Sequence, residues 1–318
     1  MTRTTIVMAA ALALVLTLPA VSAHAQNGPL TRSFVSSAGV DGNPCTIAQP
    51  CATFAHAYTA VGANGIVAAL DPGKYGPINI TGPVTINGNG WSAITGPASG
   101  TGISITAGSG NVILTGLEID GAGAAYNGIV FADGGTLEIA DCVIRNFTQS
   151  GIVVGVGSTV SLLISNTRVL DNPADGIVLE PGQAGQNAGG FIYFSFDHLT
   201  VNNNGYGIFM NSLANTGMVG TITNSVINSN LNGISFTADV GAVDNSLAIK
   251  DSSVSGNHSG SGISVSFVSL FLSHSFVADN NTGIALSNNA AVYSAGDNDL
   301  FGNFTPISGG NLQSNPKQ

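Results

Sequence analysis

Short runs of alternating apolar and polar residues recur along most of the chain, separated by clusters of Gly, Asn, Asp and Ser. In residues 137 to 154, LEIADCVIRNFTQSGIVV, the apolar residues Leu137 and Ile139 alternate with polar ones, and Val160 and Ile164 belong to a similar run further on. A period of two is that of a β-strand, and the runs are too short for helices. The pattern therefore predicts short strands joined by tight turns.

These runs are copies of one repeat. Taking Ile144 as the reference position, the equivalent apolar residue of the later copies is Val169, Val201, Ile227, Val254 and Val277. Each copy is followed by Gly-Ile, with the glycines at positions 151, 176, 207, 233, 262 and 283. Self-similarity with a period of about 20 to 50 residues indicates stacked repeats.

An asparagine follows three residues after the reference in five copies, at Asn172, Asn204, Asn230, Asn257 and Asn280, whereas the first copy has Phe147. Stacked coils place equivalent residues about 4.8 Å apart, so we expect an asparagine ladder along the stack. The alternative is a turn-forming asparagine in each copy without stacking.

The coil pattern, with its N-x-x-x-G-I turn, resembles the right-handed parallel β-helix of the pectin-lyase-like superfamily from about residue 66 to 304. Degenerate coils with Ile119 and Leu300 at the reference position extend it. The resemblance is to the generic coil and not to one enzyme family. It implies an all-β fold, a single-stranded right-handed parallel β-helix (solenoid) of about nine or ten coils.

The N-terminal part is expected to cover one end of this solenoid. Phe54, Ala57, Tyr58 and Val61 have the i, i+3, i+4, i+7 spacing of one helix face. An uncapped solenoid exposes apolar residues and strand edges, so we expect a cap with a short helix over residues 26–65. The β-helix then spans 66–304, and a polar tail, loosely ordered, spans 305–318.

Residues 1–25 have the features of a signal peptide. Arg3 supplies the positive region, residues 6 to 18 are apolar, and Ala23-His24-Ala25 forms an A-x-A cleavage site. We expect cleavage after Ala25 and export to the periplasm or the outside of the cell. No later stretch is apolar over the about 20 residues needed to span a membrane.

The three cysteines fit an exported protein. Cys45 and Cys51 flank a short loop, and in an oxidising compartment a disulfide is the expected state; a metal or redox role is the alternative. Cys142 lies two residues before the reference, where we expect a buried, inert thiol.

Charge excludes one class of partner. Without Arg3, six basic residues face 17 acidic ones, a net charge of −11. Such a surface repels phosphate backbones, so we expect no nucleic-acid binding.

Stacking also predicts which charged residues meet. Residues directly before and after the inward reference point outward and form columns along the stack. We therefore expect Asp120 beside Arg145 one coil later, with Glu118 and Arg168 close by on the same face.

The resemblance suggests chemistry for this cluster. A β-helix lyase needs a cation or metal to neutralise a uronate carboxylate and a base to take the adjacent proton, and arginine is that base in some members. This implies Glu118, Asp120, Arg145 and Arg168 as the catalytic residues. The alternative is a surface ion-pair ladder of small energetic effect.

Other candidate motifs are weaker. The G-H-G and R-I-K tripeptides of polygalacturonase-type members do not occur in the chain. Glu118 with Asp120, or Asp171 with Asp175, could form the carboxyl pair of a glycoside hydrolase by spacing alone. His198 and His274 occupy equivalent turns three coils apart, about 14 Å, and we expect them not to share a metal ion.

Three neighbouring copies have long turns after the Gly-Ile strand, starting at Glu180, Asn211 and Thr237. Long turns in a solenoid often line its binding face. Glu180, Asp239 and Asp244 could hold calcium, but they lack an ordered ligand spacing, so ordinary insertions are the alternative. No cofactor is otherwise indicated.

Two functions remain. The first is an exported protein that binds or cleaves an extracellular polysaccharide or cell-surface glycan, as a lyase more than as a polygalacturonase-type hydrolase. The second is a non-enzymatic envelope or surface protein, an adhesive or structural rod. The first depends on analogy of fold.

Overall fold

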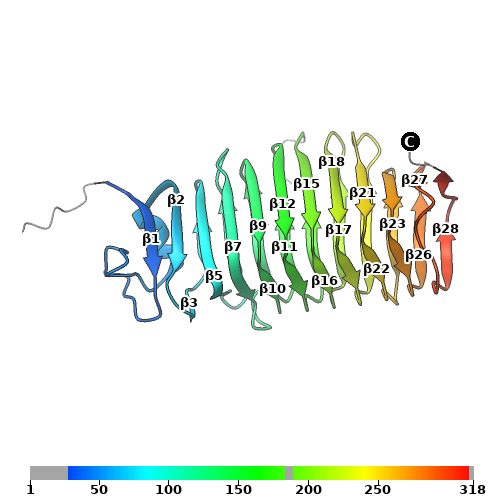
Figure 1. The fold of residues 1–318 in the computed structure, drawn as a ribbon. Helices are drawn as coiled ribbons and strands as arrows, with labels where there is room; N and C mark the ends of the chain where they lie inside the picture. Colours follow the sequence, from blue (N-terminus) through cyan, green and yellow to red (C-terminus); the bar gives the residue numbers. More distant parts are fainter. Residues whose placement is uncertain (1–27, 183–188, 315–318) are drawn as a thin grey trace, which may run out of the picture.

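A computed structural model describes residues 28–182 and 189–314 of the protein (Figure 1). The signal peptide predicted over residues 1–25 lies outside this range. The described chain is a rod of parallel strands that winds from the N-terminal end to the C-terminal end, with one short helix, α1 (Phe54–Ala60). The all-β solenoid predicted from the repeats is therefore confirmed.

Most coils contribute strands to three parallel ladders that run along the rod. The first ladder is formed by β1 (Leu30–Val35), β2 (Val61–Ala69), the first parts of β5 (Val84–Thr95) and β7 (Val112–Asp120), and then β9 (Thr136–Ala140), β12 (Val160–Ser165), β15 (Phe191–Asp197), β18 (Gly217–Thr223), β21 (Ser246–Lys250), β24 (Ser269–Ser273), β27 (Ala291–Ser294) and β29 (Gln313–Ser314).

The second ladder consists of very short strands. It is formed by β3 (Gly73–Lys74), the last parts of β5 and β7, and then β10 (Val143–Arg145), β13 (Arg168–Leu170), β16 (Thr200–Asn202), β19 (Val226–Asn228), β22 (Ser253–Ser255) and β25 (Phe276–Ala278).

The third ladder is a separate ten-stranded sheet. It is formed by β4 (Ile78–Ile80), β6 (Thr101–Thr106), β8 (Asn127–Asp133), β11 (Ser150–Val154), β14 (Asp175–Leu179), β17 (Tyr206–Ser212), β20 (Asn232–Ala238), β23 (Ser261–Ser266), β26 (Thr282–Ser287) and β28 (Thr305–Ser308).

The register of the second ladder matches the sequence repeat. The reference residues pair in order from Ile119 and Ile144 to Val277, and all of them are fully buried. Fully burying such a side chain contributes about 1.5–3 kcal/mol, so this column is a main part of the core.

The predicted asparagine ladder is present and buried. Asn204, for example, donates from Nδ2 to Oδ1 of Asn230 (3.0 Å), and its backbone N–H donates to the same oxygen. Asn172, Asn230, Asn257 and Asn280 make equivalent bonds to the next member of the ladder, which ends at Asn303. Each buried amide therefore has partners in the adjacent coil, which avoids the cost of an unsatisfied polar group.

The ladder also explains the glycine of the Gly-Ile repeat. A Cβ at Gly207 would lie 2.9 Å from Nδ2 of Asn230, and one at Gly233 would lie 2.9 Å from Nδ2 of Asn257. Gly128 packs instead against the Phe147 ring, which replaces the amide in the first copy. The glycine is needed because the side chain of the next coil occupies the space of its Cβ.

The helix of the N-terminal cap is shorter than the apolar spacing predicted. Thr53 caps α1, Phe54 and Ala57 are buried, and the helix ends at Ala60. Val61 is not helical but begins β2, so its predicted place on the helix face is wrong. Val61 pairs with Leu30 of β1, so the chain continues there as a strand instead of a further helical turn.

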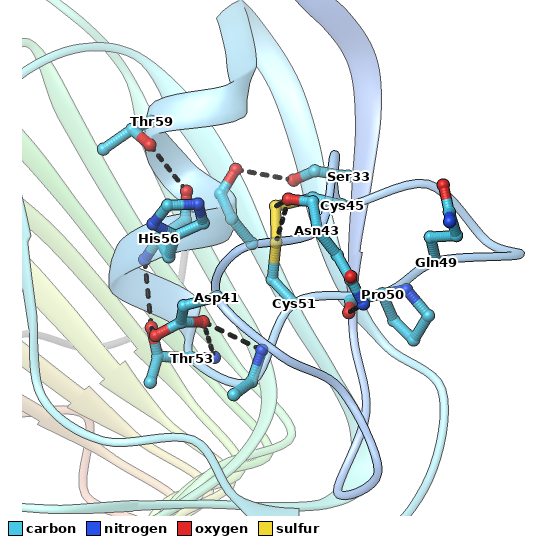
Figure 2. Close-up of a disulfide and its surroundings, with 12 residues drawn as sticks. Ser33, Asp41, Asn43, Cys45, Gln49, Pro50, Cys51, Thr53, His56 and Thr59 are labelled. Atoms are coloured by element: carbon cyan, nitrogen blue, oxygen red, sulfur yellow. Dashed lines mark hydrogen bonds between the residues drawn. A yellow bond between two sulfur atoms is a disulfide. The ribbon is translucent and has the colours of Figure 1, made fainter.

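The Cys45–Cys51 disulfide closes the loop before the helix, as predicted (Figure 2). The carboxylate of Asp41 accepts hydrogen bonds from the backbone N–H groups of Ala52 and Thr53 and from the Thr53 hydroxyl. The disulfide and Asp41 together fix the loop against the start of α1.

The strands extend beyond the range 66–304 assigned to the β-helix. At the N-terminal end β1 joins the first ladder before that range, and at the C-terminal end β28 and β29 continue the ladders after it. Cys142 is buried as predicted, and burial raises its pKa to about 12, which keeps the thiol protonated and unreactive.

Candidate functional site

The predicted charged cluster lies on the second ladder. Strand pairing places Glu118 of β7, Val143 of β10 and Arg168 of β13 in one outward row. Asp120, Arg145 and Leu170 form the adjacent row. The expected stacking of Asp120 beside Arg145 is therefore present.

Arg145 joins two carboxylates of the preceding coil. Its Nη2 atom lies 2.5 Å from Oε1 of Glu118 and 3.3 Å from Oδ2 of Asp120. Asp120 also accepts from the backbone N–H of Ala122 (2.8 Å) and from Nδ2 of Asn146 (3.1 Å). All three charged side chains are partly exposed, so this arrangement fixes the Arg145 guanidinium in place more than it stabilises the fold.

Arg168 is on the same face but is not part of this ion-pair group. Val143 separates it from Glu118 in the row, so the two lie two strand spacings apart, about 10 Å. Within the described residues no ion pair involves the Arg168 side chain, which is exposed. The site thus has one arginine held by carboxylates and one available to a ligand.

A surface cavity of about 460 Å³ connects these residues. Glu118, Arg145 and Arg168 line it, with Asp141 and Asp171 from the flanking turns, while Asp120 does not. The cavity therefore brings together three of the four predicted site residues.

The outward rows are not exposed throughout. Leu170, which was expected to point to solvent, is 7% exposed, and Ala278 is fully buried. A short or apolar side chain in such a row is covered by the side chains at the same position of the adjacent strands, which shield it from solvent.

The long turns do not wall the cavity. They connect β14 to β15, β17 to β18 and β20 to β21, so they join the third ladder to the first. The cavity lies on the second ladder, and no described residue of these turns lines it. Residues 183–188 of the first long turn lie outside the described residues.

Glu180, Asp239 and Asp244 occur in these turns. In the part of the chain that the structure describes, the close group of potential metal ligands consists of Cys45, Cys51 and His56. Both sulfurs of that group are bonded to each other, so they are not thiolate ligands. Calcium binding at the long turns stays a prediction.

Sequence reasoning placed His198 and His274 in equivalent turns but missed that these turns form a column of polar residues between the first and second ladders. Asp141, Asn166, His198, Asn224 and Asp251 have φ between 45° and 57°, a left-handed conformation in which Asn, Asp and His are enriched. The recurrence of these residue types three positions before the reference is the signal that could have found it.

Asp197 is the best-connected carboxylate of this edge. Hydrogen bonds from Thr223 (2.6 Å), Asn224 (2.8 Å) and His198 (2.6 Å) lower its pKa to about 2. His198 and His274 both line a second cavity of about 520 Å³, where Asn224 and Asp251 of the intervening coils separate them.

The second carboxyl pair considered for hydrolysis has a structural explanation. Asp171 is a left-handed turn residue that accepts from Nδ2 of Asn203 (2.6 Å), and Asp175 begins β14 beside Ser150. Burial raises the pKa of Asp175. Asp171, but not Asp175, lines the cavity on the second ladder.

Some of the exposed aromatic rings lie on the outer side of the first ladder. Tyr193 is 49% exposed, and Phe271 stacks on Tyr293 of the next coil with ring centroids 5.0 Å apart. The alternation within β24 marks Phe271 as outward.

Comparison with known proteins agrees with this architecture. Residues 59–189 match the family model described as right handed beta helix region. The protein is a right-handed parallel β-helix. No curated protein sequence matches this β-helix. Among the described residues, no helix is long and apolar enough to cross a membrane.

Solved structures share the fold at low sequence identity. The β-helix is similar to pectate lyase Pel9A (TM-score 0.57, 16% identity, covering 86% of this chain and 79% of that one). It is also similar to an alginate lyase from Paenibacillus sp. str. FPU-7 (TM-score 0.53, 15% identity, covering 89% and 99%). Tailspike protein 2 of Escherichia coli O157:H7 bacteriophage CAB120 matches over 83% of this chain and 38% of its own (TM-score 0.50, 10% identity). At these identities the likeness establishes the parallel β-helix fold alone.

Proposed function

We propose that the protein is exported and binds an extracellular polysaccharide at the cavity lined by Glu118, Arg145 and Arg168, and that elimination is the cleavage reaction these residues support. One observation carries the proposal. Arg168 faces the cavity without an ion-pair partner in the described residues, next to a guanidinium that two carboxylates hold in place. The folds of a pectate lyase and an alginate lyase support the choice of ligand class.

The ion pairs suggest a role for each group. Two adjacent carboxylates already bind the Arg145 guanidinium, so it acts as a fixed hydrogen-bond donor and not as the base. Arg168 can pair with a uronate carboxylate or with neighbouring sugar hydroxyls. Glu118 is the predicted site residue in the cavity that can accept a proton.

In the proposed cleavage, a base takes the proton next to the uronate carboxylate. The bond between the sugar and the oxygen of its neighbour breaks, a carbon–carbon double bond forms, and the released oxygen is protonated. The product absorbs ultraviolet light, so cleavage and binding can be measured separately.

The test is a panel of polygalacturonate, alginate and dextran, with and without calcium. Retention of the protein in gels containing each polysaccharide measures binding, while ultraviolet absorbance and reducing ends measure cleavage. We expect retention of the wild type by an acidic polysaccharide and about tenfold weaker retention of Arg168→Gln. Arg32→Gln, an exposed arginine on β1, is the matched control and should bind normally. Absence of retention and of cleavage with all three would refute the proposal.

Export is tested by the mature N-terminus. Protein recovered from the periplasm or the medium of an expressing bacterium should begin at Gln26. Recovery of the full chain from the cytoplasm alone would contradict export.

A structural or adhesive rod is the second candidate, and the position of the cavity favours it. The long turns do not enclose the cavity, so the charged cluster lies on an open flank of the rod. A protein that shows neither retention nor cleavage but coats cells or self-associates would support this alternative.

A further inference from the structure

The cavity of the second ladder is bordered by an irregular segment of β5. Asn87 pairs with Thr115 and Ser92 pairs with Leu117, so residues 88–91 lie opposite Gly116 alone. The segment has the sequence Gly-Asn-Gly-Trp. Gly90 of this segment lines the cavity, and Trp91 follows it directly.

The segment is held in a fixed conformation. Nδ2 of Asn89 donates to the carbonyl of Ala69, the Asn89 N–H donates to Oδ1 of Asn87 (2.8 Å), and the Ser92 hydroxyl donates to the carbonyl of Gly88 (2.7 Å). Asn89 and Gly90 have φ of 56° and 79°. A Cβ at Gly116 would lie 2.7 Å from the Gly90 nitrogen, so a glycine there makes room for the segment.

This segment presents the only tryptophan of the chain to solvent. Trp91 is 51% exposed, and no described residue forms a hydrogen bond or a ring contact with its indole. A single exposed apolar side chain is common and carries no function by itself. Here the ring stands on a rigid segment at the border of a polar cavity, and ligand sites combine aromatic surface with a few polar groups.

The strand register gives the separation along the rod between Arg168 and the part of β5 that follows this ring. Ala93, two residues after Trp91, pairs with Glu118, which leads through Val143 to Arg168 in the same row. Three strand spacings separate the two ends, about 14 Å along the rod. A sugar chain that lies along the rod axis can therefore contact both.

We infer that Trp91 forms a sugar-stacking subsite, which binds the apolar face of a pyranose ring while Arg168 holds a polar group of a unit further along the same chain. This rests on the proposed function. The indole offers a flat apolar surface and an N–H donor, and stacking on it needs no charge on that sugar. The polysaccharide would then run parallel to the rod axis across β5, β7, β10 and β13.

The single tryptophan makes this subsite directly observable. The polysaccharide whose gel retains the protein is added to the wild type in solution, and tryptophan emission is excited at wavelengths where tyrosine does not absorb. We expect a blue shift and weaker quenching by acrylamide on addition of the polymer. The monosaccharide of the same polymer cannot span about 14 Å and should have little effect.

Substitution gives an independent measurement. Trp91→Ala should weaken gel retention about tenfold, and Trp91→Phe should weaken it less, with melting temperatures close to that of the wild type. Tyr193→Ala removes a ring of similar exposure from the first ladder and should bind as the wild type does.

The outcomes separate the two proposals. The subsite is overturned, and the proposed function is left in place, if a polysaccharide retains the wild type and Trp91→Ala equally and does not change the tryptophan emission of the wild type. Loss of retention in Tyr193→Ala but not in Trp91→Ala would assign binding to the first ladder instead. If none of the polysaccharides retains the wild type, the proposed function fails, and the subsite fails with it.

Discussion

Hydrogen bonds from neighbouring residues lower the pKa of two carboxylates of this protein. Asp71 accepts hydrogen bonds from the hydroxyl of Ser36, the hydroxyl of Tyr75 and the backbone N–H of Ser37. These bonds favour the charged form and lower the pKa of Asp71 from 3.8 to about 2. Asp197 has a pKa lowered to about 2 by Thr223 and its other turn partners.

Both carboxylates predict acid sensitivity. Their pKa is lower in the folded chain than in the unfolded chain, so their stabilisation is complete above about pH 5 and is lost as the pH falls toward 2. The melting temperature should therefore decrease over this range, and Asp71→Asn should decrease less steeply than the wild type. Asp239→Asn, an exposed carboxylate on a long turn, is the control. Equal pH slopes for all three proteins would contradict the assignment.

At the scale of the element, the strand and its turn depend on the coil that follows. The amide of Asn230 accepts from Asn204, and it donates to the carbonyl of Val201 and to Asn257. The Gly-Ile repeat and the asparagine column are therefore two parts of one packing arrangement, since each glycine contacts the amide of the next coil.

Removal of one ladder amide should be costly. Asn230→Ala leaves buried donors and acceptors on both neighbouring coils, and we expect a loss of about 2–4 kcal/mol in unfolding free energy. The measurement is chemical denaturation followed by circular dichroism. Asn202→Ala, at an outward position of β16, should change stability by about 0.5 kcal/mol or less. A similar small effect at Asn230 would show that the ladder is not a stabilising element.

Period and register could be predicted at this scale, but the ends of elements could not. The alternation around Ile144 fixes which side chains point inward, so the pairing of Asp120 with Arg145 followed from counting residues. Val61 fitted a helix face equally well, and its pairing with Leu30 decided for a strand. Arg168 lies two coils from Glu118 with Val143 between them, so counting coils also gives their separation of two strand spacings.

The candidate site was predicted in part for the same reason. Glu118, Arg145 and Arg168 share a cavity because all belong to the regular repeat. Trp91 lies where β5 departs from the repeat, opposite Gly116, and no periodic pattern predicts what an insertion places beside it. Long turns, which the sequence does mark, proved to lie on a different side of the rod.

At the scale of the whole molecule, each coil contacts mainly its two neighbours, so the ends of the rod need protection. At the N-terminal end α1 and the disulfide loop pack beside β1 (Figures 1 and 2). Stability in such a stack is the sum of coil stabilities and contacts between neighbours, and unfolding can begin at an end.

Opening the disulfide should therefore act locally. Cys45→Ser with Cys51→Ser should lower the stability of the cap by about 2 kcal/mol, the effect expected for a short closed loop. Hydrogen exchange should become faster in β1 and remain unchanged in β20. Ile47→Ala, an exposed residue of the same loop, is the control. Equal acceleration in both strands would mean that the rod unfolds as one unit.

The equal offset of all three ladders between two neighbouring coils has a consequence for how such a gene can change. From β15 to β20, each residue pairs with the one 26 positions later in all three ladders, and the asparagine ladder keeps the same interval. Loss or duplication of a DNA segment that encodes those 26 residues would leave every remaining strand with a partner and every amide with a neighbour. The length of the rod can therefore evolve in whole coils by recombination between similar segments, without intermediate sequences that fail to fold.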